Sequence, residues 1–395
     1  MPELQTPPEQ AAPRPAQKKE IGPETFVFVV LFVGFFAVFA VKMGLVNAMN
    51  TLMNTAYSLL MDTVLYLTAI CVVMGAVSDM FAEFGVVSLA NRLLQPLMRP
   101  LYWLPGAASL GIVTTFLSDN PVILTLADNR YFRSFFKAYQ FPALTNLGTS
   151  FGMGLIVMSF CLGLGNSVPH VTAAVLCGGA GAIAGSILST RLMLHFTARA
   201  LGRSKDACDT TEAVSAPTQA ATDRGMIRLV NTLLAGGKKG VELGLAVIPG
   251  ILIICTLVMM LTGGMPDGGY TGSAFEGIGL LPAAANKLHF IIDPLFGFTH
   301  PADLAVPVTA LGSAGAAMGL ISPLVSAGQA GANDIAVFTA MCMCWSGYLC
   351  THVSMMDVLG YSRFTGKAIL SHTIGGLFAG VCAHWLFVLV SALLA

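Results

Sequence analysis

The chain has 395 residues, of which only 10% are charged and 55% are hydrophobic, and 20 lysines and arginines balance 20 aspartates and glutamates. Soluble domains carry about 25% charged residues, so the composition excludes an ordinary soluble enzyme. Zero net charge without a basic block argues against a nucleic-acid partner. We therefore expect an all-α polytopic membrane protein that lies in the lipid bilayer and is not an enzyme.

Residues 1–23 are polar and rich in proline, and no short apolar core with a cleavage site follows them. We expect a disordered cytoplasmic tail at 1–23, followed by a first transmembrane helix and loop at 24–55. Uncharged stretches of about 20 residues can cross a bilayer. They predict about seven transmembrane helices, near 25–46, 56–80, 143–165, 169–195, 240–262, 332–355 and 367–392.

Two further apolar stretches, 106–127 and 303–327, are interrupted by proline, glycine and polar residues. Such stretches are typical of re-entrant helical hairpins, because non-helical backbone is tolerated where protein covers it. A partly amphipathic segment precedes each one, at 84–104 and 278–298, and we expect both segments to lie at the membrane interface. The polar segment at 198–237 is expected to be a cytoplasmic linker.

Short matches separated by almost constant distances indicate an internal repeat. Ala90-Asn91-Arg92-Leu93 is matched 195 residues later by Ala285-Asn286-Lys287-Leu288, and Pro100-Leu101-Tyr102 is matched 194 residues later by Pro294-Leu295-Phe296. The glycine pair Gly181 and Gly185 recurs as Gly376 and Gly380, again 195 residues later. The matches predict repeat 1 at 56–197, with the hairpin 106–127, and repeat 2 at 238–395, with the hairpin 303–327.

Positive charges in short loops mark the cytoplasmic side of a membrane protein. The stretch 191–239 contains eight lysines and arginines, whereas 263–275 contains none. This asymmetry predicts a cytoplasmic amino terminus and an external carboxyl terminus. The two repeats then have inverted topology, and inverted repeats with broken helices are typical of secondary transporters.

The tip of the first hairpin reads Ser118-Asp119-Asn120-Pro121 between apolar arms. Because Pro121 has no amide hydrogen and disfavours helix at Asn120, the tip is expected to unwind. An intramembrane carboxylate is costly and is by default a functional-site hypothesis, although Asp119 and Asn120 could also cap a helix. The next span carries Asn146, Thr149 and Ser150 among glycines, which suits either a cation site or close helix packing.

The second hairpin has no charge inside it, and its Ser313 could contact an uncharged polar ligand. Further candidate substrate contacts are Gln329, Asn333, Thr351 and His352, while Asn333-Asp334 could instead cap the following helix. Cysteines, methionines and His352 at 341–356 are also soft metal ligands. Cys344 and His352 are about 12 Å apart along a helix, which disfavours a shared ion.

The segment Leu94–Gly106, LQPLMRPLYWLPG, leads into the Ser118–Pro121 tip and is echoed from Asp293 onward. In these residues the chain resembles the nucleoside-recognition, or Gate, domain family, including the concentrative nucleoside transporters. The resemblance covers roughly 60–200 and, more weakly, 235–395. It implies inverted hairpin repeats, symport with Na⁺ or H⁺, and a homo-oligomer in a bacterial cytoplasmic (inner) membrane. Nucleoside transporters carry a Gln-Thr-Glu-Ala-Pro type signature at the first hairpin, where this chain has the shorter Asp119.

The sequence thus predicts an ion-coupled secondary transporter of a small polar solute, with a nucleoside or nucleobase as the leading candidate. The expected coupling-ion site comprises Ser118, Asp119, Asn120, Asn146 and Thr149. The expected substrate contacts are Ser150, Ser313, Gln329, Asn333, Thr351 and His352. We expect no catalytic residue, no bound metal and no cofactor. The alternatives are a transition-metal permease and a non-transporting membrane scaffold or signalling protein of the spore-maturation type.

Overall fold

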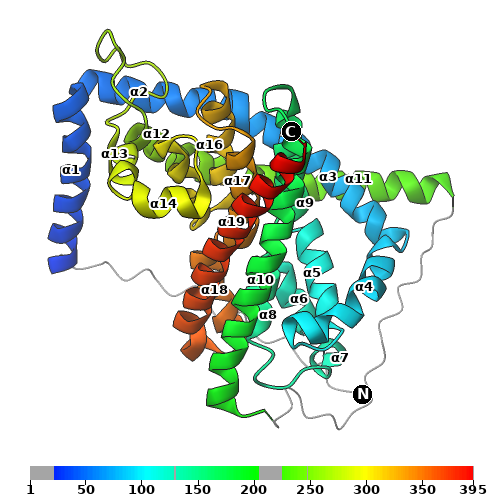
Figure 1. Cartoon of the computed structure of the whole chain (residues 1–395). Helices are drawn as coiled ribbons and strands as arrows, with labels where there is room; N and C mark the ends of the chain where they lie inside the picture. The colour runs from blue at the N-terminus through cyan, green and yellow to red at the C-terminus, as the bar shows by residue number, and fades with distance from the viewer. Residues whose placement is uncertain (1–21, 129, 204–224, 247, 395) are drawn as a thin grey trace, which may run out of the picture.

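The computed structural model describes residues 22–128, 130–203, 225–246 and 248–394, which are mainly helical and contain no strand (Figure 1). Six helical stretches in this part of the chain are long and apolar enough to cross a bilayer: Pro23–Met43, Leu45–Glu83, Ala143–Asn166, Val171–Leu201, Met226–Thr262 and Ser362–Leu393. The expectation of an all-α polytopic membrane protein is therefore confirmed. Most of the predicted tail and the centre of the predicted linker lie outside the described residues.

Within the described residues, the first half of the chain forms ten α-helices. They are α1 (Pro23–Met43), α2 (Leu45–Ser58), α3 (Leu65–Glu83), α4 (Val86–Leu97), α5 (Ala108–Leu117), α6 (Val122–Asp128), α7 (Arg130–Arg133), α8 (Ala143–Thr149), α9 (Gly154–Gly163) and α10 (Val171–Leu201). A π-helical segment, Leu59–Val64, joins α2 to α3, and a second one, Met98–Tyr102, follows α4. A short 3₁₀ segment, Leu164–Asn166, extends α9.

The second half forms nine α-helices in the ranges 225–246 and 248–394. They are α11 (Met226–Ala246), α12 (Thr256–Thr262), α13 (Leu280–Lys287), α14 (His289–Phe296), α15 (Ala305–Ala310), α16 (Ala314–Ser326), α17 (Ala332–Trp345), α18 (Tyr348–Val358) and α19 (Thr365–Leu394). The π-helical segment Gly250–Cys255 precedes α12, and the 3₁₀ segments Pro301–Leu304 and Ser362–Phe364 precede α15 and α19. Loop 263–279 separates α12 from α13.

Corresponding elements of the two halves occur in the same order. Helices α4 and α13 begin at Val86 and Leu280, 194 residues apart. The long helices α10 and α19 begin at Val171 and Thr365, again 194 residues apart. Between them, each half contains a helical hairpin (α5–α6 and α15–α16) and a broken helix (α8–α9 and α17–α18).

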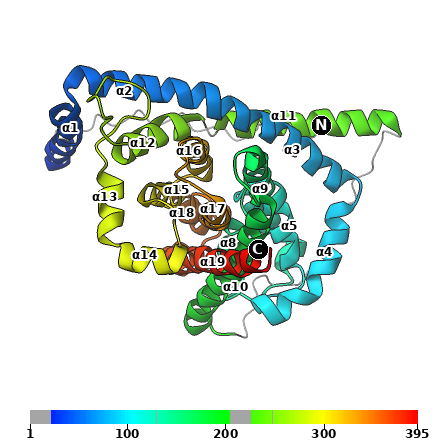
Figure 2. The same ribbon diagram turned by 45° about the horizontal axis from the view of Figure 1, so that its top comes forward.

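The hairpins and broken helices lie inside a frame of longer elements (Figure 2). Helices α2, α3 and α11 run along one edge, α4 and α13–α14 flank the two sides, and α10 and α19 lie at the opposite edge. The long helices within each edge pack on one another, α3 against α11 and α10 against α19. This arrangement places both hairpins inside the frame (Figure 2).

Small residues allow the long helices to pack closely. On α11, a side-chain carbon at Gly240 would overlap the carbonyl of Cys71 in α3, and one at Gly236 would overlap that of Gly75. On α10, a side-chain carbon at Gly185 would overlap the carbonyl of Gly375 in α19. Small residues spaced four apart are the usual device for close helix approach in membranes.

Several elements differ from the sequence-based expectation. The span expected at 143–165 is divided into α8 and α9, and part of the loop expected after the first transmembrane helix is helical in α2. The span expected at 332–355 is divided into α17 and α18, because Ser346 and Gly347 leave the helical conformation. Helix α11 begins at Met226, inside the segment expected to be a linker. The early start of α11 is stabilised by Arg228, whose Nε forms an ion pair with Glu83 Oε1 of α3 at 2.5 Å.

Candidate solute and ion site

The tip of the first hairpin is non-helical, as expected from Pro121. Helix α5 ends at Leu117, Ser118 adopts φ −134° and ψ −122°, and α6 begins at Val122. Ser118 is exposed, whereas Asn120 is only 1% exposed. The tip therefore offers one residue to solvent and turns another into the protein.

Each hairpin tip is bonded to the break in the broken helix of its own half. In the first half, the Met153 amide donates to the Ser118 carbonyl oxygen at 3.1 Å. In the second half, the Gly347 amide donates to the Ala310 carbonyl oxygen at 3.0 Å. Both donors have left-handed backbone conformations, with φ 54° at Met153 and φ 69° at Gly347. The repeat thus brings two hairpin tips against two helix breaks.

Asn120 connects the two halves at this point. Its Nδ2 donates to the carbonyl oxygen of Ser346 at 2.6 Å, and the Ser346 hydroxyl donates to the Gly152 carbonyl oxygen at 3.4 Å. A side-chain carbon at Gly152 would overlap Asn120 Oδ1, so this close approach requires glycine. The buried Oδ1 itself has no hydrogen-bond partner. It is an available oxygen ligand in the membrane interior.

The other residues of the expected ion site are not all directed at the tip. Asp119 Oδ1 accepts from the Asn120 amide at 2.7 Å. Thr149 ends α8 just before the first break, and its buried hydroxyl has no hydrogen-bond partner. Asn146 Nδ2 instead donates to Ser189 Oγ of α10 and to the Ala368 carbonyl of α19, both at 3.0 Å. Asn146 therefore holds α8 against α10 and α19.

The expected substrate contacts are dispersed. Ser313 caps α16 at the second hairpin tip by accepting from the Ala316 amide at 3.1 Å. Gln329 and Asn333 follow the far end of α16, about 20 Å away for 13 helical residues. Asn333 Nδ2 donates to the Phe296 and Gly297 carbonyls, at 2.9 and 2.7 Å. The structure does not bring Gln329 and Asn333 to the tip.

The remaining expected contacts lie at or near the helix breaks. Two of them donate to backbone carbonyls, and the third has no hydrogen-bond partner. Ser150 Oγ donates to the Asn146 carbonyl at 2.8 Å, and Thr351 Oγ1 donates to the Gly347 carbonyl at 3.2 Å. His352 is fully buried, and neither ring nitrogen has a hydrogen-bond partner. Its ring centre lies 4.6 Å from that of His372 in α19. His352 therefore lies in an aromatic cluster between α18 and α19.

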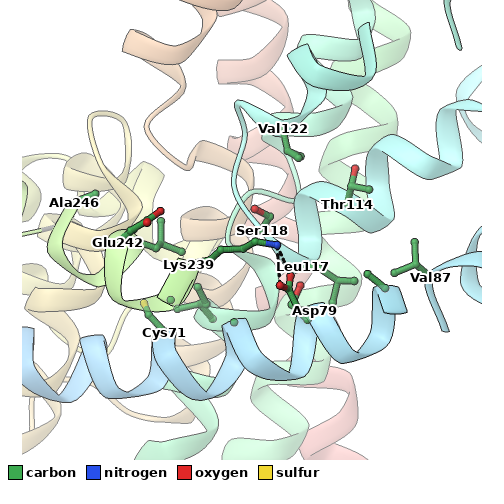
Figure 3. A pocket seen from close by; sticks show the side chains of 16 residues that line it. Cys71, Asp79, Val87, Thr114, Leu117, Ser118, Val122, Lys239, Glu242 and Ala246 are labelled. Atoms are coloured by element: carbon green, nitrogen blue, oxygen red, sulfur yellow. Dashed lines mark hydrogen bonds and ion pairs between the residues drawn. The ribbon is translucent and has the colours of Figure 1, made fainter. Parts of the chain in front are cut away.

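A cavity of about 550 Å³ lies between α3, α11 and the first hairpin tip (Figure 3). Ser118 and Thr114 line it from the hairpin, and Figure 3 shows Ser118 close to the ion pair between Lys239 and Asp79. Lys239 Nζ is 2.7 Å from Asp79 Oδ2. Glu242 of α11 lines the same cavity. The cavity therefore combines hydroxyl groups with charges of both signs beside apolar walls.

Asp79, Lys239, Glu242 and Thr114 are not among the residues expected from the sequence to contact solute. The signal for the first three was present, because they are charged residues within or beside the apolar segments 56–80 and 240–262. Ionisable residues in such segments indicate functional sites by default. Thr114 carries no comparable signal, since hydroxyl residues are common in membrane helices.

The soft side chains at 341–356 are involved in packing. Cys344 Sγ donates to the Ala182 carbonyl of α10 at 3.5 Å. Within the described residues, no group of three or more histidine, cysteine, aspartate or glutamate side chains is arranged to hold a metal ion.

No family model and no curated protein sequence matches the chain. Solved structures of CNTnw, a concentrative nucleoside transporter, share its fold. A doubly substituted CNTnw variant in an outward-facing state gives a TM-score of 0.53 at 13% identity, over 93% of this chain and 85% of that chain. CNTnw in an inward-facing, substrate-bound state gives a TM-score of 0.52 at 14% identity, over 92% and 84%. The chain is thus a multi-pass membrane protein with the fold of CNTnw.

Proposed function

We propose that this protein is an ion-coupled secondary transporter of a small polar metabolite, with a nucleoside or nucleobase as the leading candidate, and that it works by alternating access. One observation carries the proposal: the first hairpin tip contacts both helix breaks beside a 550 Å³ cavity. Broken helices that meet inside the membrane are where secondary transporters bind their solutes. The likeness to CNTnw in outward- and inward-facing states supports the same mechanism.

The coupling ion, Na⁺ or H⁺, is assigned to the first hairpin and the first break, with Ser118, Asp119, Asn120, Asn146 and Thr149 as the candidate set. The strongest support comes from the unpartnered oxygens of Asn120 and Thr149, because buried polar atoms are normally hydrogen-bonded. Carbonyl and hydroxyl oxygens suit a hard cation. The bonds of Asn146 to Ser189 and Ala368 give it a supporting role, in which it fixes α8.

The solute is assigned to the cavity in Figure 3. Ser118 and Thr114 would bond to hydroxyl or ring-nitrogen groups, and the Asp79–Lys239 pair supplies one acceptor group and one donor group. Ser150 of the first half lies at the first break, and Ser313, Thr351 and His352 of the second half lie on the second hairpin tip and beside the second break. Movement of the hairpins and broken helices against α3 and α11 would expose the cavity to each side in turn.

The charge asymmetry supports an amino terminus in the cytoplasm and a carboxyl terminus outside, and the resemblance to the Gate domain family implies a bacterial cytoplasmic membrane. The exposed apolar residues of α1, α2 and α3 give the protein a surface for lipid or for a second copy. We expect a homo-oligomer built on this surface, without nucleic acid and without catalytic activity.

Uptake into proteoliposomes tests the proposal. Purified protein is given radiolabelled nucleosides, nucleobases and amino acids under a Na⁺ gradient, a proton gradient or no gradient, with Fe²⁺ and Zn²⁺ as further cargo. We expect gradient-driven uptake of a nucleoside or nucleobase that is lost in Asn120→Ala. Uptake of a metal alone would favour the permease alternative. No uptake under any gradient would favour a scaffold.

A further inference from the structure

A pair of buried aspartates lies at the base of the second hairpin, away from the candidate ion site. Asp303 is in the 3₁₀ segment Pro301–Leu304 that opens the hairpin, and Asp334 is in the first turn of α17, which follows it. Both residues are fully buried. Their carboxyl groups are held next to each other, because Asp303 accepts from the His300 amide and Asp334 accepts from the adjacent Thr299 amide.

The two carboxyl groups have unequal hydrogen-bonding environments. Asp334 accepts from the Thr299 amide at 2.9 Å, from the Gly331 amide at 2.7 Å and from the Thr299 hydroxyl. Asp303 Oδ2 accepts only from the His300 amide at 2.8 Å, and Oδ1 is buried without a hydrogen-bond partner. Asp334 is thus equipped to be the anion, whereas Asp303 lacks the donors that an anion needs.

Two adjacent carboxylates in a buried site cannot both ionise without a large cost, so such pairs share one proton. Within the described part of the chain, no lysine or arginine forms an ion pair with Asp303 or Asp334. A proton on Asp303 Oδ1 would remove the repulsion and supply a donor toward Asp334. It would also account for the unpartnered oxygen atom.

A small cavity lies beside the segment that carries Asp303. It has a volume of about 130 Å³, and Thr299, His300, Pro301 and Leu304, which surround Asp303 in the chain, line one side. His289 and Asp293 of α14 line the other side. The cavity therefore places two imidazole groups and a carboxyl group next to the base of the second hairpin.

The other titratable groups near the pair are few. His384 of α19 is the nearest, and its Nδ1 lies 2.7 Å from Oδ1 of Asn333, the neighbour of Asp334. Helices α15 and α16, the arms of the hairpin, contain no titratable side chain. The other titratable groups on the packed elements are Lys287 of α13, His170, Cys177, Arg191, His195 and Arg199 at the start of or within α10, Lys367, His372 and Cys382 of α19, and Cys161, Cys342 and Cys344 of α9 and α17.

We propose that Asp303 and Asp334 form a proton-binding site that holds a single shared proton and is loaded through the cavity lined by His289 and His300. When the proton leaves to water in this cavity, the pair changes from one negative charge to two, and repulsion separates Asp303 at the start of the hairpin from Asp334 after its end. The base of the hairpin is closed, with Asp303 against Asp334, when the proton is bound, and it opens when the proton is lost. The role in coupling rests on the proposed function; the proton site itself does not.

Infrared difference spectroscopy of the purified full-length protein, titrated from acid to alkaline buffer, tests the site with the proton as the only probe. The wild type should show the carbonyl band of a protonated carboxylic acid at neutral pH, and this band should disappear in Asp303→Asn. The same band should persist in Asp267→Asn, which changes an exposed carboxylate in the loop 263–279. A wild-type spectrum without the band, or a band unchanged in Asp303→Asn, overturns the proposal.

Thermal unfolding of the same proteins gives a second readout. Asp303→Asn imitates the protonated form and keeps an acceptor for the His300 amide, so it should fold. The thermal midpoint of the wild type should fall at alkaline pH, and that of Asp303→Asn should not. Asp334→Asn should be less stable than Asp303→Asn, because it alone loses bonds to Thr299 and Gly331. An Asp303→Asn protein that is as sensitive to alkali as the wild type contradicts the shared proton. This result would leave the uptake assay, and with it the proposed function, untouched.

Discussion

Asn120 of the first hairpin and Ser346 at the second helix break are joined by a hydrogen bond of 2.6 Å, although 226 positions separate them in the chain. The side-chain amide of one repeat donates to a backbone carbonyl of the other repeat. This carbonyl has no partner within its own helix, because the helix is broken there. The hairpin of one half is therefore held by the break of the other. A motion that separates the hairpin from α17–α18 must break this bond.

Replacing Asn120 with alanine removes the bond and leaves the buried Ser346 carbonyl without this donor. An unsatisfied buried polar group costs about 1–3 kcal/mol, so the thermal midpoint in detergent should fall. We expect uptake to fall roughly tenfold or more, since about 1.4 kcal/mol corresponds to a factor of 10. Asn54→Ala is the matched control, because it removes a 2.8 Å bond from Nδ2 to the Gly272 carbonyl, away from the cavity. Equal uptake in both variants would contradict the assigned role.

Substituting Gly152 with alanine tests the close approach of Asn120 to the first break. The added carbon would overlap Asn120 Oδ1 and lie 2.8 Å from Ser346 Oγ. Overpacking of this kind costs about 1–3 kcal/mol, and we expect loss of uptake together with a lower thermal midpoint. Gly34→Ala in α1, where nothing lies within 4 Å, should leave both quantities unchanged. A fully active Gly152→Ala protein would show that the tip and the break do not meet as described.

Neutralising the ion pair between Asp79 and Lys239 tests whether these side chains contact the solute or only stabilise the fold. Lys239→Met and Asp79→Asn should each reduce uptake with little loss of stability, since exposed ion pairs contribute only about 0–1 kcal/mol. The control is Arg228→Gln, which breaks the other ion pair between α3 and α11 but does not line the cavity. If the exchanged pair Asp79→Lys with Lys239→Asp restores full uptake, the pair is structural and does not contact solute.

Glu276 in the loop between α12 and α13 gives a pH-dependent prediction. Burial raises the pKa of its carboxyl, but hydrogen bonds from the Thr271 hydroxyl and from the backbone amides of residues 271–273 outweigh this and hold the pKa below its ordinary value. A carboxyl group with a lowered pKa stabilises the folded state at pH values above its pKa in the unfolded chain, which is about 4.3. This stabilisation is lost as the pH falls through the pKa in the folded state.

The thermal midpoint of the wild type should therefore fall on acidification below about pH 4.3. Glu276→Gln should be less stable than the wild type at neutral pH and should show less of this acid-induced loss. Exposed Asp267→Asn in the same loop provides the comparison and should behave as the wild type. If acidification lowers the thermal midpoint of Glu276→Gln as much as that of the wild type, the Glu276 carboxylate does not stabilise the loop.

Much of the fold could be predicted because the bilayer imposes strong length and polarity rules. Uncharged runs located the long helices, and the recurrence of Ala90 and Pro100 at offsets of 195 and 194 anticipated the matched starts of α4 and α13. Pro121 correctly placed the non-helical tip, because a missing amide hydrogen acts locally. The break at Ser346 was not predicted, since the segment around it is as apolar as a continuous span.

The site was harder to predict, because hydropathy does not show which way a polar side chain points. Asn146 and Asn120 have the same side-chain chemistry, yet Asn146 is bonded to α10 and α19 while Asn120 reaches Ser346. Asn333 is bonded to the end of α14 and to His384. The sequence places Lys239 in the positively charged stretch that is expected to be cytoplasmic, but the packing of α11 on α3 brings its side chain to the wall of the cavity.

Uptake into proteoliposomes, compared between the wild type and Asn120→Ala under imposed ion gradients, tests the central claim most directly. Accumulation of a labelled nucleoside or nucleobase that requires a Na⁺ or proton gradient, and that Asn120→Ala loses while Asn54→Ala keeps, is the predicted result. Contradiction would come from wild-type protein that is folded and correctly inserted yet accumulates none of the tested solutes under any gradient.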